Sequence, residues 1–130
     1  MPKKSGWDLA HLALLLPAAA IFCYLAGRRG LFPFDQSILF DGGYRVLLGQ
    51  VPYRDVLLPF GPVSLWLQGA IFGLLGVSWR SYLLSAALAN ALATLLAYRI
   101  LRRLFPGSRL PAVVGAVLTA IWFPIVPVGT

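Results

Sequence analysis

The chain has 130 residues, of which 59% are hydrophobic and only 12% charged, and its formal net charge is +7. Its uncharged runs are longer than a soluble domain needs, so this composition excludes an ordinary soluble protein and indicates an integral membrane protein. The eleven Lys and Arg lie between the apolar runs, where cations set topology and meet lipid head groups, so the charge does not indicate nucleic-acid binding.

Four runs approach the length of about 20 apolar residues that a helix needs to cross a bilayer. They are residues 9–26, 56–78, 81–98 and 111–128. The first run continues past its small residues, so we expect a retained span with a cytoplasmic N-terminus rather than a cleaved signal peptide, the alternative. The single cysteine, Cys23, and the single histidine, His11, both lie in this run, and we expect both to be structural.

A short helix is predicted directly after the first span. Asp35 or Ser37 can cap its N-terminus, and the residues that follow give it a partly apolar face. Gly49 and the turn at Pro52 predict its end. We expect this helix to lie along the outer membrane surface.

The run 56–78 is long enough to span, but its prolines and glycines make it a poor straight helix. If it spans, three cations lie inside and eight outside. If it lies in the outer interface or re-enters, six lie inside and five outside, which agrees better with the positive-inside tendency. We favour the second arrangement, with an outer loop over about residues 27–80 that contains two surface-lying helices.

The last two runs complete an all-α, polytopic membrane fold with three or four transmembrane helices. In residues 81–98 small side chains recur at every fourth position, which predicts close approach of another helix. These residues are Ser81, Ser85, Ala89, Ala93 and Ala97. Asn90 predicts a hydrogen bond between helices, with a ligand role as the alternative. The run 111–128 ends almost at the last residue, which indicates part of a larger protein.

Several features in this order resemble one family of membrane enzymes. They are Asp35 after the first span, the segment Leu47–Asp55 (LLGQVPYRD), Gly61-Pro62, Leu75-Gly76 and the segment 102–106 (RRLFP). The series resembles the N-terminal part of C-superfamily (GT-C) glycosyltransferases, in particular the bacterial group related to protein O-mannosyltransferases and the lipid A aminoarabinose transferase. The resemblance covers residues 5–128, and about the first quarter of such an enzyme.

In that family an acidic residue begins a juxtamembrane helix in the first extracytoplasmic loop, and Asp35 matches it. The resemblance implies a polyprenyl-phosphate-linked sugar as donor. For Asp35 it implies the role of general base on the acceptor hydroxyl, or of ligand to a divalent cation. An interfacial carboxylate suits the first role, because partial desolvation raises its basicity. A helix cap without a catalytic role is the alternative for Asp35.

Three arginines are candidate ligands of the donor phosphate, because a guanidinium fork suits a phosphate. They are Arg28, Arg29 and Arg54, and anchoring of the neighbouring span is their alternative role. Asp55 follows Tyr53 and Arg54 in a turn, where we expect it to pair with Arg54 and so to support the loop.

Other polar residues have simpler interpretations. Asp41 and Arg45 stand four residues apart on the predicted helix, which is typical of a surface ion pair. Phe60 stands where many relatives have Lys or His, which weighs against a phosphate contact at that position. The chain has no phosphate-binding glycine loop, no metal-spaced His/Cys cluster and no Ser/His/Asp set, so nucleotide hydrolysis and peptidase chemistry have no support.

The expected function is therefore transfer of a lipid-linked sugar to an extracytoplasmic acceptor at the bacterial inner membrane. The chain is expected to be truncated and to need further spans or a partner subunit. The alternative is a non-enzymatic membrane subunit or a transporter fragment. Replacement of Asp35 by Asn discriminates the two, because only a transferase depends on its carboxylate.

Overall fold

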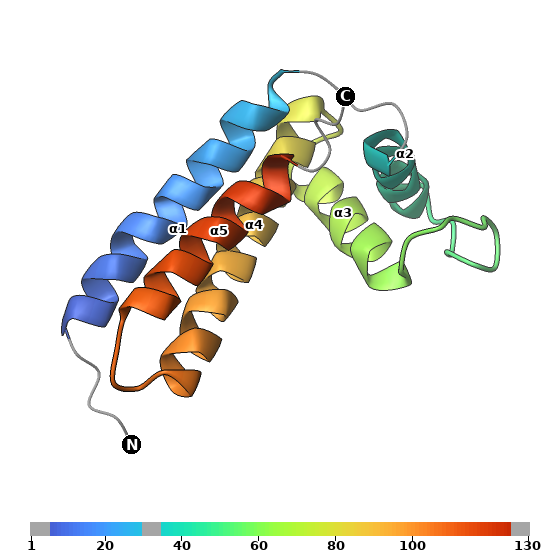
Figure 1. The fold of residues 1–130 in the computed structure, drawn as a ribbon. Coiled ribbons are helices and arrows are strands. Elements are labelled where there is room, and N and C mark those ends of the chain that lie inside the picture. Colours follow the sequence, from blue (N-terminus) through green and yellow to red (C-terminus); the bar gives the residue numbers. More distant parts are fainter. Residues whose placement is uncertain (1–5, 30–34, 126–130) are drawn as a thin grey trace. The chain divides into compact units, whose positions relative to one another are not determined.

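The computed structural model describes residues 6–29 and 35–125. They form five helices, in agreement with the predicted all-α class (Figure 1). These are α1 (Gly6–Gly27), α2 (Asp35–Leu47), α3 (Pro62–Leu75), α4 (Trp79–Leu104) and α5 (Leu110–Ile125). The chain divides into two compact units. The three-helix unit contains the residues up to Gly27 and from Ala86 onward, and the hairpin unit contains Arg28–Ser85.

Two helices are long and apolar enough to cross a membrane. They are α1, with 22 residues, and α4, with 26, and they coincide with the predicted spans 9–26 and 81–98. The helices α3 and α5 have 14 and 16 residues. At a rise of about 1.5 Å per residue they extend about 21 and 24 Å, short of the roughly 30 Å of hydrocarbon. The predicted span 111–128 coincides with α5, and its last three residues lie outside the described part.

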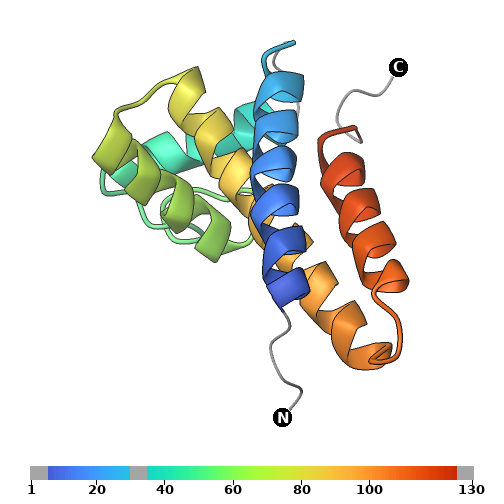
Figure 2. The same cartoon turned by 90° about the vertical axis from the view of Figure 1, so that its left-hand side faces the viewer.

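In the three-helix unit, α1, α5 and the second part of α4 lie side by side (Figures 1 and 2). The helices α1 and α5 contact each other, and Leu12 and Leu15 of α1 pack against the cluster that contains Ala112 and Ala116 of α5. Ala112, Ala116 and Ala120 follow one another at every fourth position of α5, and all three are buried, as is Ala19 of α1. Tyr98 of α4 packs against this alanine row. Small residues therefore do set helix spacing here, but they lie on α5.

The predicted small-residue contact on α4 holds at its start, where Ser81 is buried and the hydroxyl of Ser85 donates to Gln68 of α3, but it is wrong at its centre. Ala89, at the centre of that series, is exposed, whereas α4 buries Ala87, Asn90, Thr94 and Tyr98. The reason is geometric: a step of four residues turns about 40° beyond one full turn, so a series of such steps winds around the helix. The four steps from Ser81 to Ala97 turn the series by about 160°, so it cannot stay on one face, whereas Ala87, Asn90, Thr94 and Tyr98 lie within about 80° of one another.

In the hairpin unit, α2 and α3 pack with glycines at their contact. A Cβ atom added at Gly43 would lie 2.4 Å from Cγ of Gln68, and one added at Gly69 would lie 3.1 Å from the carbonyl oxygen of Gly43. The backbones are therefore nearly in contact. The glycines of residues 56–78, which we expected only to weaken a helix, allow α2 to approach α3.

The end of α2 lies where Gly49 predicted it, and a proline and a glycine also bound α3. After α2, Gly49 has a φ of +85°, and its N–H donates to the carbonyl of Val46 at 2.9 Å. Pro62 begins α3, since a proline at this position loses no helical hydrogen bond. Gly76, with a φ of +81°, ends it. Residues 56–78 thus contain a short helix rather than one continuous span.

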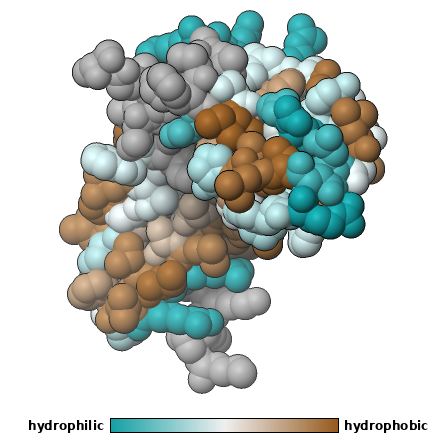
Figure 3. All heavy atoms as spheres, turned by 90° about the vertical axis from the view of Figure 1, so that its right-hand side faces the viewer, coloured by the Kyte–Doolittle hydropathy of each residue, from teal (hydrophilic) through white to brown (hydrophobic). Residues whose placement is uncertain are grey.

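Both units expose many large apolar side chains. On α4 they include Leu84, Leu88, Leu92 and Leu96, and on α3 Val63, Trp66, Leu67 and Leu74. Figure 3 faces the side of α2, α3 and their connecting loop, and it shows broad brown apolar surface beside teal polar surface. Soluble monomers rarely expose contiguous apolar surface to this extent, which agrees with the membrane assignment made from composition.

Candidate functional site

The loop between α2 and α3 holds three of the predicted site residues in one tight turn. Within it, the N–H of Tyr53 donates to the carbonyl of Val56 at 2.8 Å. The N–H of Asp55 donates to the carbonyl of Val51 at 2.9 Å. The hydroxyl of Tyr53 donates to the carbonyl of Phe60. Tyr53 has a φ of +67°, which is uncommon for a bulky residue. These contacts hold a backbone shape that an isolated chain would rarely adopt.

Arg54 and Asp55 form the predicted pair in this turn. Nε and Nη2 of Arg54 each donate to one oxygen of Asp55 at 2.8 Å. Oδ2 of Asp55 also accepts the N–H of Val51 at 2.8 Å. The Arg54 guanidinium and the Val51 N–H together lower the pKa of Asp55 to about 2. Because Asp55 occupies one edge of its guanidinium, Arg54 meets another anion only with its remaining donors or by exchanging partners.

The predicted ion pair on α2 is confirmed. Nε of Arg45 lies 2.6 Å from Oδ2 of Asp41, and Nη1 of Arg45 donates to Gln50 at 3.4 Å. Both charged side chains are about half exposed. A pair of this kind on a helix surface contributes about 0.3–0.5 kcal/mol, so its role is local support of α2.

Asp35 is the first residue of α2 and is exposed. A carboxylate in the first helical turn is stabilised by the unpaired backbone N–H groups there. Residues 30–34 lie outside the described part, so the predicted cap is not tested. Arg28 and Arg29 are exposed and follow α1. Among the described residues, no side-chain contact joins Asp35 to these arginines or to Arg54.

The described part of the chain contains no preformed set of ligands for the predicted divalent cation. Among residues 6–29 and 35–125, no three His, Cys, Asp or Glu side chains lie together as a metal-binding group. Asp35 alone would supply one ligand, and a hard cation such as Mg²⁺ usually takes one or two carboxylates together with substrate phosphates. The cation therefore stays a prediction that depends on the substrate.

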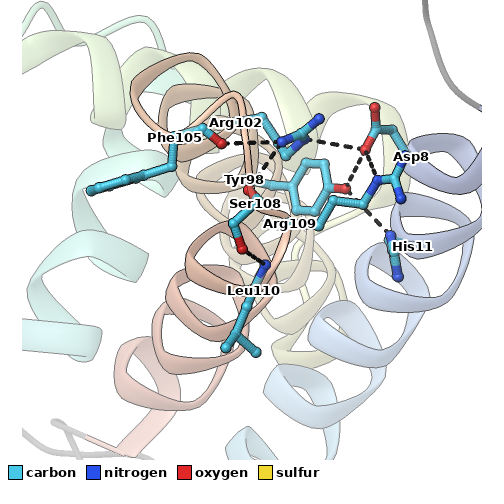
Figure 4. Close-up of polar contacts among 8 residues, drawn as sticks. All are labelled: Asp8, His11, Tyr98, Arg102, Phe105, Ser108, Arg109 and Leu110. Carbon is cyan, nitrogen blue, oxygen red and sulfur yellow. Dashed lines mark hydrogen bonds and ion pairs between the residues drawn. The ribbon is translucent and has the colours of Figure 1, made fainter.

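Sequence reasoning missed a polar cluster at one end of the three-helix unit (Figure 4). Oδ1 of Asp8, in α1, accepts the hydroxyl of Tyr98 at 3.0 Å and Nε of Arg102 at 3.2 Å, and Nε of Arg109 lies 3.5 Å away. Nδ1 of His11 lies 3.4 Å from the Tyr98 hydroxyl. Arg102 also donates to two carbonyls of the α4–α5 turn. This cluster shows that α1 and α4 run antiparallel.

A sequence signal for this cluster did exist. Asp8 is the only acidic residue outside the segment 35–55, and arginines lie near the end of the later span. Two antiparallel helices bring these positions to the same end. The ion pair between Asp8 and Arg102 was not predicted, because these two residues are 94 positions apart and neither belongs to a local motif.

Asn90 forms the predicted hydrogen bond between helices. It is fully buried, and its Nδ2 donates to the carbonyls of Ala19 in α1 and Ala120 in α5, at 3.0 and 3.1 Å. In an α-helix the carbonyl of residue 120 would accept the N–H of residue 124, which is a proline and has none. Asn90 therefore supplies the donor that Pro124 lacks.

The chain was compared with protein-family models, curated proteins and solved structures, and no match was found. The chemistry available at the site is that of an exposed carboxylate on a short helix, a preshaped loop beside it in sequence and several arginines. A carboxylate so placed can accept a proton or bind a cation.

Proposed function

We propose that this chain is the N-terminal part of a membrane glycosyltransferase that moves a sugar from a polyprenyl-phosphate carrier to an extracytoplasmic acceptor. The observation that carries the proposal is the exposed carboxylate of Asp35 at the first turn of α2, in a segment between two long apolar helices. Its place agrees with the ordered motifs from which the family resemblance was drawn.

The antiparallel arrangement of α1 and α4 supports the proposed topology. If both helices cross the bilayer, both ends of the segment that connects them lie on the same side of the membrane. This segment therefore cannot contain one additional span. Neither α2, with 13 residues, nor α3, with 14, is long enough to cross. The Asp8 cluster then lies on the opposite side of the membrane, together with most of the arginines of α4. The positive-inside tendency assigns this arginine-rich side to the cytoplasmic face of a bacterial inner membrane.

Within this proposal Asp35 acts as general base on the acceptor hydroxyl or as ligand to a divalent cation. Arg28 and Arg29 contact the donor phosphate, while Arg54 contributes mainly by holding the loop through Asp55. The role of Arg54 is thus narrower than the sequence alone indicates. Further spans, or a partner subunit, complete the cavity around the lipid-linked sugar.

Replacement of Asp35 by Asn tests the proposal in membranes that contain the chain completed with its further spans. Asparagine keeps the shape and the capping ability but cannot act as a base, so transfer from a lipid-linked sugar should fall about 10²–10⁴-fold. Asp41→Asn is the matched control, because it removes a carboxylate from the same helix and only a surface ion pair is lost. Near-normal transfer by the Asp35→Asn protein, at matched expression, would refute the catalytic assignment.

A non-enzymatic membrane subunit is the second candidate. It is favoured by the internal pairing of the loop charges, because Arg54 and Asp55 satisfy each other and Asp41 pairs with Arg45. A subunit that serves only assembly should tolerate Asp35→Asn. The same experiment therefore separates the two candidates.

A further inference from the structure

A row of leucines on α4 ends in two arginines. Leu88, Leu92 and Leu96 follow one another at every fourth position, and each is more than half exposed. Arg99 and Arg103 continue this surface toward the end of the helix and are also exposed. All five residues lie on the part of α4 that belongs to the three-helix unit, and they point away from the buried face of Asn90, Thr94 and Tyr98.

These two arginines differ from their neighbours in pairing. Arg102 and Arg109 lie against Asp8. Arg99 and Arg103 have no hydrogen bond or ion pair to any residue that the structure describes. They stand four residues apart on one helix, where two like charges repel each other. A bound anion between them would remove this repulsion.

The length of the row fits one leaflet of a bilayer. From Leu88 to Arg99 there are eleven residue steps, or about 16 Å of helix, and half of the hydrocarbon core measures about 15 Å. An acyl chain lying along the leucines would therefore bring its head group to the level of the arginines. A free anion would use the arginines but not the leucines.

We propose that this surface of α4 binds an anionic phospholipid, with an acyl chain along Leu88, Leu92 and Leu96 and the phosphate between Arg99 and Arg103. A guanidinium fork suits a phosphate oxygen pair, and the negative head-group charge complements the two unpaired cations. The site is independent of the proposed glycosyl transfer and lies outside the residues assigned to it.

The test uses the full 130-residue chain, purified in a neutral detergent and titrated with phosphatidylglycerol, with bound lipid counted by native mass spectrometry. Arg99→Gln/Arg103→Gln should weaken phosphatidylglycerol binding about thirtyfold, since each arginine near an anionic head group contributes about fivefold. Arg45→Gln/Arg80→Gln is the control, because it removes the same charge from the hairpin unit, outside this surface and outside the residues assigned to the donor phosphate, and should leave the affinity within about twofold. Phosphatidylcholine should bind the native chain far more weakly.

Three results would overturn the proposal. They are equal weakening by both double variants, equal binding of phosphatidylcholine, and competition by inorganic phosphate at concentrations comparable with the lipid, which would indicate a free-anion site. If the double variant does not fold, as judged by circular dichroism, Arg99→Gln and Arg103→Gln are measured singly. Each should then weaken binding about fivefold, and unchanged affinity in both would refute the site.

Discussion

The two units solve the same packing problem in different ways. In the three-helix unit, alanines bring α1 and α5 together and Asn90 bridges them through their backbone carbonyls. In the hairpin unit, glycines bring α2 and α3 almost into backbone contact, and the ion pairs connect residues no more than four positions apart. One unit is held by distant polar partners and the other by close backbone approach, so different substitutions should disrupt each.

The largest effect is expected at the glycine contact. Gly43→Ala places a methyl group 2.4 Å from Cγ and 2.8 Å from Cβ of Gln68, so α2 and α3 must move apart. Overpacking of this kind costs about 1–3 kcal/mol. The free energy of unfolding, measured by denaturant titration in detergent, should fall by this amount.

Gly73→Ala is the matched control for that change. A Cβ at Gly73 would lie 3.4 Å from a methyl group of Leu47, which is ordinary contact. Alanine favours a helix over glycine by up to about 1 kcal/mol, so this variant should be neutral or more stable. Equal losses in the two variants would show that close approach at Gly43 is not what holds α2 to α3.

A smaller effect is expected at the polar bridge of the three-helix unit. Asn90→Leu keeps the branched shape but removes both donors, and hydrogen bonds between membrane helices contribute on average about 0.6 kcal/mol each, with a maximum near 1.7. We expect a loss of about 1–2 kcal/mol in the same assay. In a Pro124→Ala background the loss should be smaller, because residue 124 then donates its own N–H to the carbonyl of Ala120. Strict additivity of the two changes would contradict the coupling.

The smallest effect concerns the loop turn and depends on pH. Arg54 and the Val51 N–H lower the pKa of Asp55 to about 2, below an ordinary Asp value near 3.9. Since the folded pKa is the lower one, the support from Asp55 is complete above about pH 4 and is lost as the pH falls toward 2. The amide resonance of Val51 should titrate in that range in nuclear magnetic resonance spectra. Titration that persists in Asp55→Asn would assign it to another group.

Sequence patterns predicted what local chemistry determines. Gly49, Pro62 and Gly76 set helix ends through backbone conformation, and Asp41 with Arg45 and Arg54 with Asp55 pair within a few residues. The helix end at Gly49 and the two ion pairs follow from neighbouring residues and were predicted, whereas the bounds of α3 at Pro62 and Gly76 were not. Asn90 was predicted to bond between helices because an amide in an apolar run needs a partner.

The features that were missed depend on which helix faces are brought together. Nothing local to Ala89 excludes it from a contact, and nothing local to Ala116 selects it, because each helix offers several small residues on different faces. The Asp8 cluster needs the antiparallel pairing of α1 and α4 before its members can be connected. The assignment of Asp35 stays a prediction, since its partners are expected among substrates and further spans.

The separation of Asp8 from its partners also bears on how the chain is made. Arg102 leaves the ribosome 94 residues after Asp8, which at about 5–20 residues per second takes about 5–20 s. During that time Asp8 has no arginine from α4 to pair with, so its carboxylate needs water; if α1 spans a bilayer, this charge keeps the first end of α1 at the membrane surface. Only when α4 has followed can the two ends be joined. The ion pair between Asp8 and Arg102 is thus a late event in biosynthesis, and it joins α4 to a helix that was made long before it.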